Sequence, residues 1–257
     1  PIFQESLAPA RRRVGVFSSP SSLWQGRPMT GSFDADAADD GGIASPARAA
    51  IGDAVRARLE RNPMVSRIDT PHLEIFGRQD FLSPEECAEL RRLIDANAQP
   101  STLFSGSANA DYRTSHSGNL SPRDPLVERI TERICALTGL PAINGETLQG
   151  QRYTPGQEYK VHCDYFPATA DYWQRMRGTG GQRTWTAMIY LSAVEAGGET
   201  HFPQCEFMVP PVEGMILIWN NMGRDGAPNR FSLHAALPVE RGTKYVVTKW
   251  FRERPWG

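Results

Sequence analysis

A histidine and an aspartate two residues apart, His162 and Asp164, are the residues whose types and spacing first suggest chemistry. On an extended strand, residues i and i+2 point to the same face, so this imidazole and this carboxylate can reach one metal ion. Two histidines and one carboxylate leave coordination positions open on a metal, which is the arrangement expected for non-haem Fe(II) oxygen chemistry. A third ligand must therefore come from elsewhere in the chain.

The pair alone is a weak signal. A chain with five histidines contains a His-x-Asp by chance in roughly a quarter of cases. A surface strand with a solvated aspartate explains the pair as well. His234 by itself is also more typical of a buried core histidine than of a metal ligand, so a further observation is needed.

That observation is Lys244, which lies ten residues after His234. Strand alternation places Lys244 and every second residue up to Trp250 on one face. A lysine that points into a core is costly unless its ammonium is paired, and a bound dicarboxylic acid would pair it. The alternative is an edge strand with Lys244 facing water. Lys249, which alternates to the other face, fits the solvated environment better.

In this order, the two-residue pair, the distant histidine and the lysine resemble the Fe(II)/2-oxoglutarate dioxygenases. More narrowly, they are similar to the catalytic domain of prolyl 4-hydroxylases. The resemblance extends over residues 70–254 approximately. Further stretches that carry it are 81–87, 113–115, 151–153, 162–166, 180–183, 190–191, 197–200 with 202–203, and 248–250.

The resemblance implies roles for individual residues. Fe(II) would be bound by His162, Asp164 and His234. The distal carboxylate of 2-oxoglutarate would form a salt bridge with Lys244, and this cosubstrate would also be held by Tyr153 and Thr186. The substrate pocket or a loop beside it would be lined by Tyr159, Arg183, Trp250 and Arg113.

The implied reaction is the hydroxylation of an unactivated C–H bond with Fe(II), 2-oxoglutarate and O2, and with ascorbate as the reductant. Succinate and CO2 are released. Asp164 favours hydroxylation, because family members that halogenate lack this carboxylate. The expected substrate is a prolyl residue of a protein or peptide, since Tyr159 and Trp250 could stack on a pyrrolidine ring.

Three alternatives stay open. A free amino acid or small metabolite would be favoured if Arg113, Arg175 or Arg183 clamped a substrate carboxylate. A non-catalytic, cupin-like metal-binding protein would bind metal without producing succinate. A nucleic-acid demethylase is weakened by the balance of 28 Lys+Arg against 29 Asp+Glu, because this chain has no bulk positive charge.

Composition sets the remaining expectations. At ~150 residues per domain, 257 residues make one or two domains. No apolar run reaches the ~18 residues of a membrane span, and the N-terminus shows no signal pattern. We therefore expect no nucleic-acid or membrane partner, and a monomer or homodimer. Four scattered cysteines without a CxxC pair indicate reduced thiols and a cytoplasmic location.

Along the chain, residues 1–46 read as a flexible low-complexity tail, 47–64 as a helical lead-in and 65–257 as the dioxygenase domain. Helices are expected over 47–61, from a capping box at 83–86, and over 124–138. Residues 100–121 and 167–181 are expected to be loops that could gate the substrate.

Short strand-like runs follow residue 139, separated by Pro and Gly. They cover 148–153, 184–191, 206–209, 214–219, 232–235 and 245–252. Such a series predicts a mainly β sandwich or barrel with flanking α-helices packed on one face. The fold that the resemblance implies is the double-stranded β-helix, a cupin-like jelly roll with helices packed on one sheet.

Overall fold

In a computed structural model, residues 42–102 and 112–257 are described. Three longer helices begin with a proline at their first turn: α1 (Pro46–Glu60), α2 (Pro84–Asn97) and α3 (Pro125–Thr138). The capping box expected at 83–86 is present. The hydroxyl of Ser83 accepts a hydrogen bond from the Glu86 backbone at 3.2 Å, and the Glu86 carboxylate accepts one from the Ser83 backbone at 3.0 Å.

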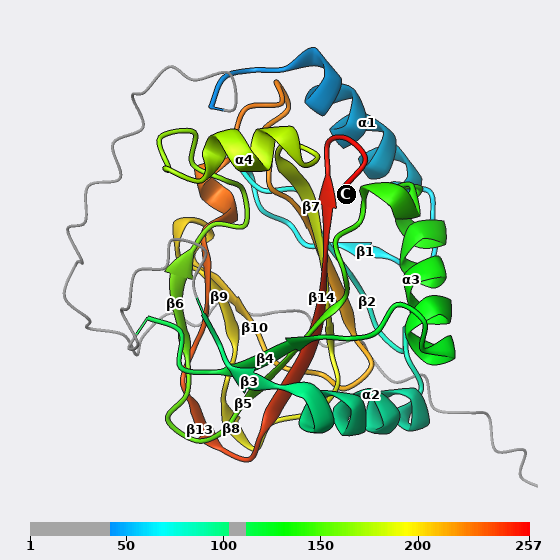
Figure 1. Cartoon of the computed structure of the whole chain (residues 1–257), viewed down its shortest axis with the longest axis vertical. Helices are drawn as coiled ribbons and strands as arrows, with labels where there is room; N and C mark the ends of the chain where they lie inside the picture. The colour runs from blue at the N-terminus through cyan, green and yellow to red at the C-terminus, as the bar shows by residue number, and fades with distance from the viewer. Residues whose placement is uncertain (1–41, 103–111) are drawn as a thin grey trace, which may run out of the picture. The chain divides into compact units, whose positions relative to one another are not determined.

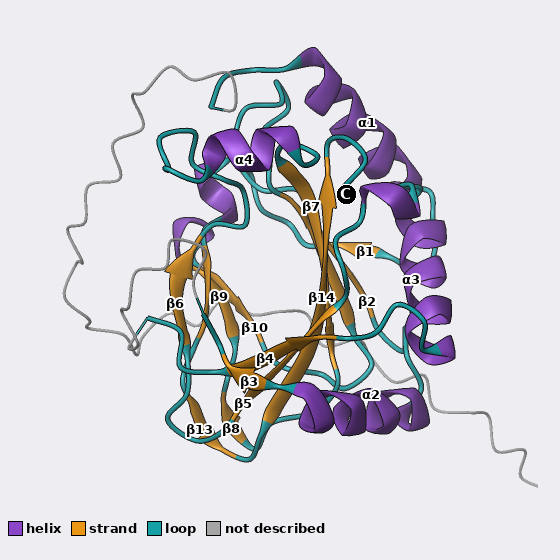
Figure 2. Cartoon of the chain, viewed as in Figure 1, coloured by secondary structure: helices purple, strands orange, loops and turns teal. Residues whose placement is uncertain are grey.

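The strands form two principal antiparallel sheets, shown in Figures 1 and 2. The large sheet has the order β1 (Ser66–Arg67), β2 (Ile75–Arg78), β11 (Ile216–Asn220), β7 (Arg183–Tyr190), β14 (Lys244–Arg252), β5 (Gln149–Tyr153), β4 (His116–Asn119) and β3 (Gln99–Pro100). The small sheet has the order β10 (Phe207–Val209), β9 (Thr200–Phe202), β12 (His234–Ala236) and β6 (Tyr159–His162). A short ladder pairs β8 (Ala196–Gly197) with β13 (Val239–Arg241).

The large sheet separates two hydrophobic clusters, and β7 shows how. Trp185, Ala187 and Ile189 point into an outer cluster with the helices, whereas Met188 and Tyr190 point into an inner cluster with the small sheet. This alternation follows from the two-residue period of a strand. The double-stranded β-helix with helices packed on one sheet is therefore confirmed.

Helix α1 contributes Val55 and Leu59 to the outer cluster. Near its start, Arg48 is buried and donates to the Glu253 carboxylate at 3.1 Å and to the Gly226 carbonyl at 2.6 Å. The lead-in expected over 47–64 therefore shares one core with the domain assigned to 65–257. Nearly all of the tail expected over 1–46 lies outside the described residues.

Both expected loops contain regular structure. In residues 100–121, of which 103–111 lie outside the described part, β4 pairs with β5 and extends the large sheet. The prediction of a loop is wrong for 116–119, because His-Ser-Gly-Asn has no apolar alternation that would mark a strand. In residues 167–181, α4 (Trp173–Gly178) packs through Trp173 and Met176 against Phe166.

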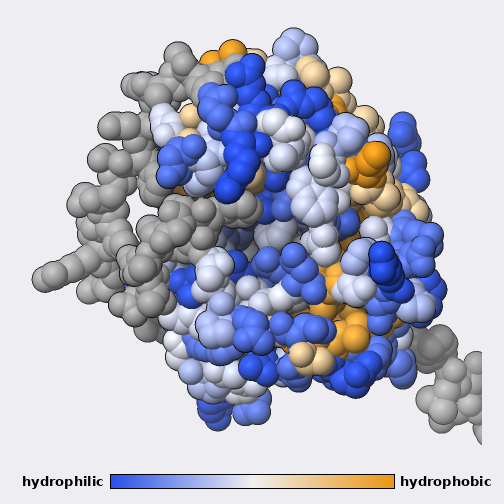
Figure 3. Space-filling view, viewed as in Figure 1, coloured by the Kyte–Doolittle hydropathy of each residue, from blue (hydrophilic) through white to orange (hydrophobic). Residues whose placement is uncertain are grey.

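On the face shown in Figure 3, hydrophilic residues cover most of the described surface, and hydrophobic ones show mainly where α2 approaches α3. None of the helices within 42–102 and 112–257 is long and apolar enough to cross a membrane.

The packing of α1 makes a testable prediction. Leu59→Ala should lower the free energy of unfolding by about 2–5 kcal/mol, because it leaves a cavity in the outer cluster. Met64→Ala removes a side chain that is 61% exposed and should change the stability by less than about 0.5 kcal/mol. Urea denaturation of the full chain measures both. Equal effects would show that α1 does not belong to the core.

Candidate active site

The small sheet brings the three candidate metal ligands together. β6 and β12 pair in a register that puts His234 opposite His162, and Asp164 lies two residues beyond the end of β6. One ligand atom from each of the three residues lies within 4.8 Å of the others. Nε2 of His234 is 3.8 Å from Oδ2 of Asp164. The structure thus assembles the complete set that the resemblance names.

Each imidazole is oriented by a backbone carbonyl two residues before it. Nδ1 of His162 lies 2.8 Å from the carbonyl oxygen of Lys160, and Nδ1 of His234 lies 2.9 Å from that of Ser232. A neutral imidazole that donates from Nδ1 keeps its lone pair on Nε2. Both rings therefore offer Nε2 to the site, as metal-binding histidines usually do.

The protonation states also suit a metal. Burial and the neighbouring His234 lower the pKa of His162 to about 3. Burial raises the pKa of Asp164, but the two histidines, a nearby arginine and a hydrogen bond from a threonine together bring it below its ordinary value. At neutral pH, His162 is therefore neutral and Asp164 is ionised. These are the forms that bind a divalent cation, so the donor set fits Fe(II).

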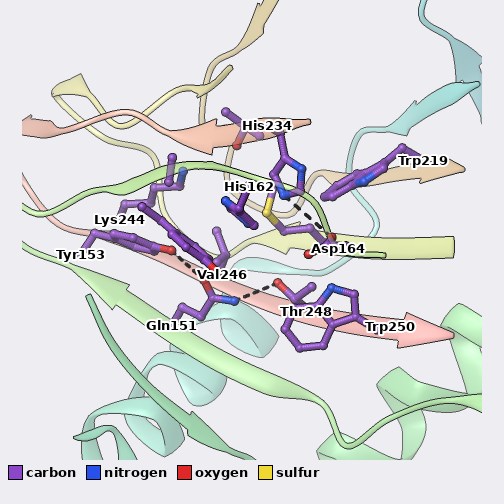
Figure 4. A pocket seen from close by; sticks show the side chains of 14 residues that line it. Gln151, Tyr153, His162, Asp164, Trp219, His234, Lys244, Val246, Thr248 and Trp250 are labelled. Atoms are coloured by element: carbon purple, nitrogen blue, oxygen red, sulfur yellow. Dashed lines mark hydrogen bonds and ion pairs between the residues drawn. The ribbon is translucent and has the colours of Figure 1, made fainter. Parts of the chain in front are cut away.

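One pocket extends from these ligands to Lys244, as Figure 4 shows. About 390 Å³ of space that no atom occupies lies in and in front of it, part of it open to solvent. Every second residue of β14 from Lys244 to Trp250 faces it, which confirms the predicted alternation. The lining residues are Gln151, Tyr153, Tyr159, His162, Asp164, Met188, Thr200, Trp219, His234, Ala236, Lys244, Val246, Thr248 and Trp250.

Lys244 is 1% exposed, and no described residue forms a hydrogen bond or ion pair with its ammonium. Nζ lies 5.4 Å from the ring centre of Tyr153 and 5.7 Å from that of Tyr190. Burial lowers the pKa of Lys244 to about 7, although the charge of Glu199 opposes this shift. Since β14 lies between β7 and β5, the alternative of a solvated edge strand is excluded. An unpaired ammonium in a pocket fits the distal carboxylate of 2-oxoglutarate.

Lys249 lies on the other face of β14, and its surroundings differ from those expected from the sequence. It is buried, and its side chain packs against Gly145. The expectation that it faces water is wrong, because residues 142–146 cover this part of the sheet. The local alternation gave the correct face for Lys249 but could not show what lies against that face.

Tyr153 is joined to two pocket residues for which the sequence had suggested no role in the site. Its hydroxyl donates to Oε1 of Gln151 at 2.7 Å, and the amide of Gln151 donates to the hydroxyl of Thr248 at 3.2 Å. Both residues share a strand face with an identified one: Gln151 precedes Tyr153 by two, and Thr248 follows Lys244 by four. The two-residue period had already placed Thr248 on the face of Lys244, and it also places Gln151 on the face of Tyr153.

Thr186, expected beside the cosubstrate, lies behind the Asp164 carboxylate instead of lining the pocket. Its hydroxyl donates to Oδ2 of Asp164 at 2.7 Å and accepts from Nδ2 of Asn221 at 2.9 Å. Asn221 was not identified from the sequence, and no spacing in the chain points to it. The protein itself therefore uses the hydrogen-bonding capacity of this hydroxyl.

Arg183, expected in the substrate pocket, also lies behind it. Nε and Nη2 donate to the two carboxylate oxygens of Glu146 at 2.6 and 2.7 Å, and Arg252 donates to the same carboxylate at 2.5 Å. The Arg183 guanidinium lies 4.1 Å from the ring centre of Trp250. Its visible role is to support Trp250, which does face the pocket.

The remaining two predicted substrate residues lie close together. The Tyr159 ring stacks on the His162 ring, with centres 3.5 Å apart. The guanidinium of Arg113 lies 4.8 Å from the centre of the Tyr159 ring and donates to Oε1 of Gln149 at 2.9 Å. Tyr159 thus lines the pocket beside a candidate metal ligand, and Arg113 supports it from the neighbouring segment.

Comparison with known proteins gives consistent results. Residues 148–252 match the model of the 2OG-Fe(II) oxygenase superfamily. The chain is 36% identical over 200 residues to prolyl 4-hydroxylase 1 of Arabidopsis thaliana, covering 70% of this chain and 69% of that one. It is 39% identical over 179 residues to the prolyl 4-hydroxylase subunit alpha-3 of Mus musculus, of which it spans 33%.

Among solved structures, it is similar to a viral collagen prolyl hydroxylase from Paramecium Bursaria Chlorella virus-1 in complex with 2OG. That likeness has a TM-score of 0.54 and 26% identity, and covers 69% of this chain and 95% of the other. The relatives, the fold and the His-Asp-His set lead to the same conclusion. The chain belongs to the 2OG-Fe(II) oxygenase superfamily, among the homologues of the prolyl 4-hydroxylases.

Proposed function

We propose that this dioxygenase hydroxylates a prolyl residue of a protein or peptide. The observation that carries the proposal is a single pocket with the His-Asp-His set at one end and the unpaired ammonium of Lys244 at the other. The first fits Fe(II) and the second fits the distal carboxylate of 2-oxoglutarate. The relatives named as prolyl 4-hydroxylases support the choice of substrate.

Bound Fe(II) and 2-oxoglutarate supply the oxidative chemistry, in which O2 is consumed, succinate and CO2 are released, and one oxygen atom enters a C–H bond. His162, Asp164 and His234 hold the metal. Lys244 would orient the cosubstrate through its charge, and the nearby rings of Tyr153 and Tyr190 would keep water from that ion pair. The protein therefore contributes geometry and a dry, charged pocket.

Aromatic rings support a prolyl substrate. Tyr159 and Trp250 both line the pocket, and each is held flat by a partner, His162 or Arg183. Rigid aromatic faces suit the apolar pyrrolidine ring.

The arginines give less support to a small carboxylic acid as the substrate. That alternative required Arg113, Arg175 or Arg183 to clamp a carboxylate. Arg113 donates to Gln149, and Arg183 forms a bidentate pair with Glu146. Arg175 is exposed on α4 and does not line the pocket. The structure therefore favours a peptide over an acidic metabolite.

Three expectations about the location, the oligomeric state and the reductant stay predictions. We propose a cytoplasmic location, which the four free cysteines support, because disulfides are rare there. We also propose that the protein acts as a monomer or homodimer and that ascorbate serves as the reductant.

The proposed reaction can be tested by succinate release. With Fe(II), 2-oxoglutarate, O2 and ascorbate, a proline-rich peptide should stimulate succinate formation and gain one oxygen atom, measured by mass spectrometry. Asp164→Ala should abolish both signals, because it removes a metal ligand. Asp171→Ala, an exposed aspartate in the following loop, is the matched control and should keep them.

Other outcomes of this assay are informative. Stimulation by free proline instead of the peptide would show that the substrate is a free amino acid, and the assignment as a dioxygenase would stand. Metal binding without succinate under any condition would favour the non-catalytic metal-binding alternative. Normal turnover by Asp164→Ala would overturn the assignment of the metal ligands.

The buried ammonium makes a second prediction, on pH. The pKa of Lys244 is about 7, and a bound carboxylate would stabilise the charged form. Below pH 7, the lysine is already charged and the Kd for 2-oxoglutarate should be nearly constant. Above pH 7, binding must take up a proton, so Kd should rise up to about tenfold per pH unit. Calorimetry between pH 6 and 9 on the metal-loaded protein measures this.

Two lysine variants complete the test. Lys244→Met should weaken 2-oxoglutarate binding by about 10- to 100-fold, because a charge-assisted contact is lost, and should remove the pH dependence. Lys249→Met replaces a buried lysine on the opposite face of β14 and should keep the wild-type pH profile. A wild-type Kd that does not change up to pH 9 would show that Lys244 does not bind the cosubstrate.

A further inference from the structure

We propose that Thr186 and Asn221 form a hydrogen-bond relay that positions the Asp164 carboxylate and thereby sets the metal affinity of the site. This inference rests on the proposed function, because it takes Asp164 as a metal ligand. It gives Thr186 a role different from the one that the family resemblance implies, and it assigns Asn221 a positioning role in the site.

The directions of the hydrogen bonds follow from counting protons. An ionised carboxylate only accepts, so the hydroxyl of Thr186 must donate its single proton to Asp164. The hydroxyl oxygen can then only accept from Asn221, which orients the amide with Nδ2 toward Thr186. Thr186 therefore has no proton left for 2-oxoglutarate. The relay runs in one direction, from Asn221 through Thr186 to Asp164.

Asp164 needs such support more than the other two ligands do. His162 and His234 lie in paired strands, and each ring is held by a backbone carbonyl. Asp164 lies beyond the end of β6, and within the described residues the only hydrogen bond to its carboxylate comes from Thr186. Thr186 lies on β7 of the large sheet. The relay therefore fixes Asp164, which follows a strand of the small sheet, to β7 of the large sheet.

Asn221 is itself firmly placed. Its backbone N–H donates to the carbonyl of Thr184 at 2.8 Å, and its carbonyl accepts from the backbone of Asn229 at 2.9 Å. Its side chain is fully buried, and Oδ1 has no partner among the described residues. An unpartnered buried acceptor is destabilising. A role in orienting Thr186 accounts for an amide at this position, where an apolar side chain would avoid that cost.

The test measures metal binding without turnover. The apo protein is titrated with Co(II) in the absence of 2-oxoglutarate, and the visible absorbance of the bound ion reports affinity and ligand geometry. Thr186→Val keeps the shape and removes the donor, and should weaken Co(II) binding by about 10- to 100-fold, as expected for a group that hydrogen-bonds a metal ligand. Thr186→Ser restores the hydroxyl and should recover most of the affinity. Asn221→Leu leaves the Thr186 donor in place and should give an intermediate loss.

Matched controls separate positioning from folding. Thr184→Val makes the same substitution two residues earlier on β7, at a buried threonine whose hydroxyl donates to the carbonyl of Phe251. It should leave the Co(II) affinity and spectrum unchanged. Circular dichroism checks that each variant is folded, and if Thr186→Val is not, Thr186→Ala provides the hydroxyl-free comparison.

The outcomes distinguish a failure of the relay from a failure of the proposed function on which it rests. If Asp164→Ala weakens Co(II) binding but Thr186→Val does not, the relay is overturned and the metal site stands. The relay is equally overturned if Thr186→Val raises only the Kd of 2-oxoglutarate in the metal-loaded protein, since Thr186 would then hold the cosubstrate. If the wild type shows no Co(II) binding that depends on Asp164, the proposed function and the relay both fail.

Discussion

The antiparallel register between β6 and β12 is the constraint on which the site depends. It puts His234 opposite His162, on the face of the small sheet that looks toward the large one. A slip of one residue would turn the side chains of either strand to the other face, so the two imidazoles could no longer meet. Asp164 lies beyond the paired part of β6, and a threonine of the large sheet holds it. The site therefore exists only where the two sheets face each other.

Buried charge around the pocket is stabilised in two different ways. Glu146 accepts hydrogen bonds from Arg183 and Arg252, and this pairing offsets the desolvation of all three groups and supports Trp250. Among the described residues Lys244 has no such partner, and its lowered pKa reflects the cost of burying the charge. An unpaired ammonium at the end of a pocket destabilises the protein by itself, and an anionic ligand would pair its charge. The pairing of Glu146 with two arginines gives rigidity, and the unpaired Lys244 provides a place for an anion to bind.

Much of the site could be predicted from the sequence because it obeys local rules. The spacing of His162 and Asp164, and the alternation that starts at Lys244, follow the two-residue period of strands and need no knowledge of distant contacts. The start of α2 at Ser83 is equally local, since a capping box lies within one turn. The order of helices and short strands along the chain then predicted a mainly β fold with helices on one sheet.

Only the tertiary structure decided which side chains meet across elements. It joined Thr186 to Asp164 instead of to the pocket, paired Arg183 with Glu146, and covered Lys249, whose strand face alone had suggested solvent. Each of these contacts links segments far apart in the chain. A local pattern determines the face of an element on which a residue lies. The packing and register of the elements decide what lies against that face, and with it whether a polar side chain binds a ligand or positions a neighbour.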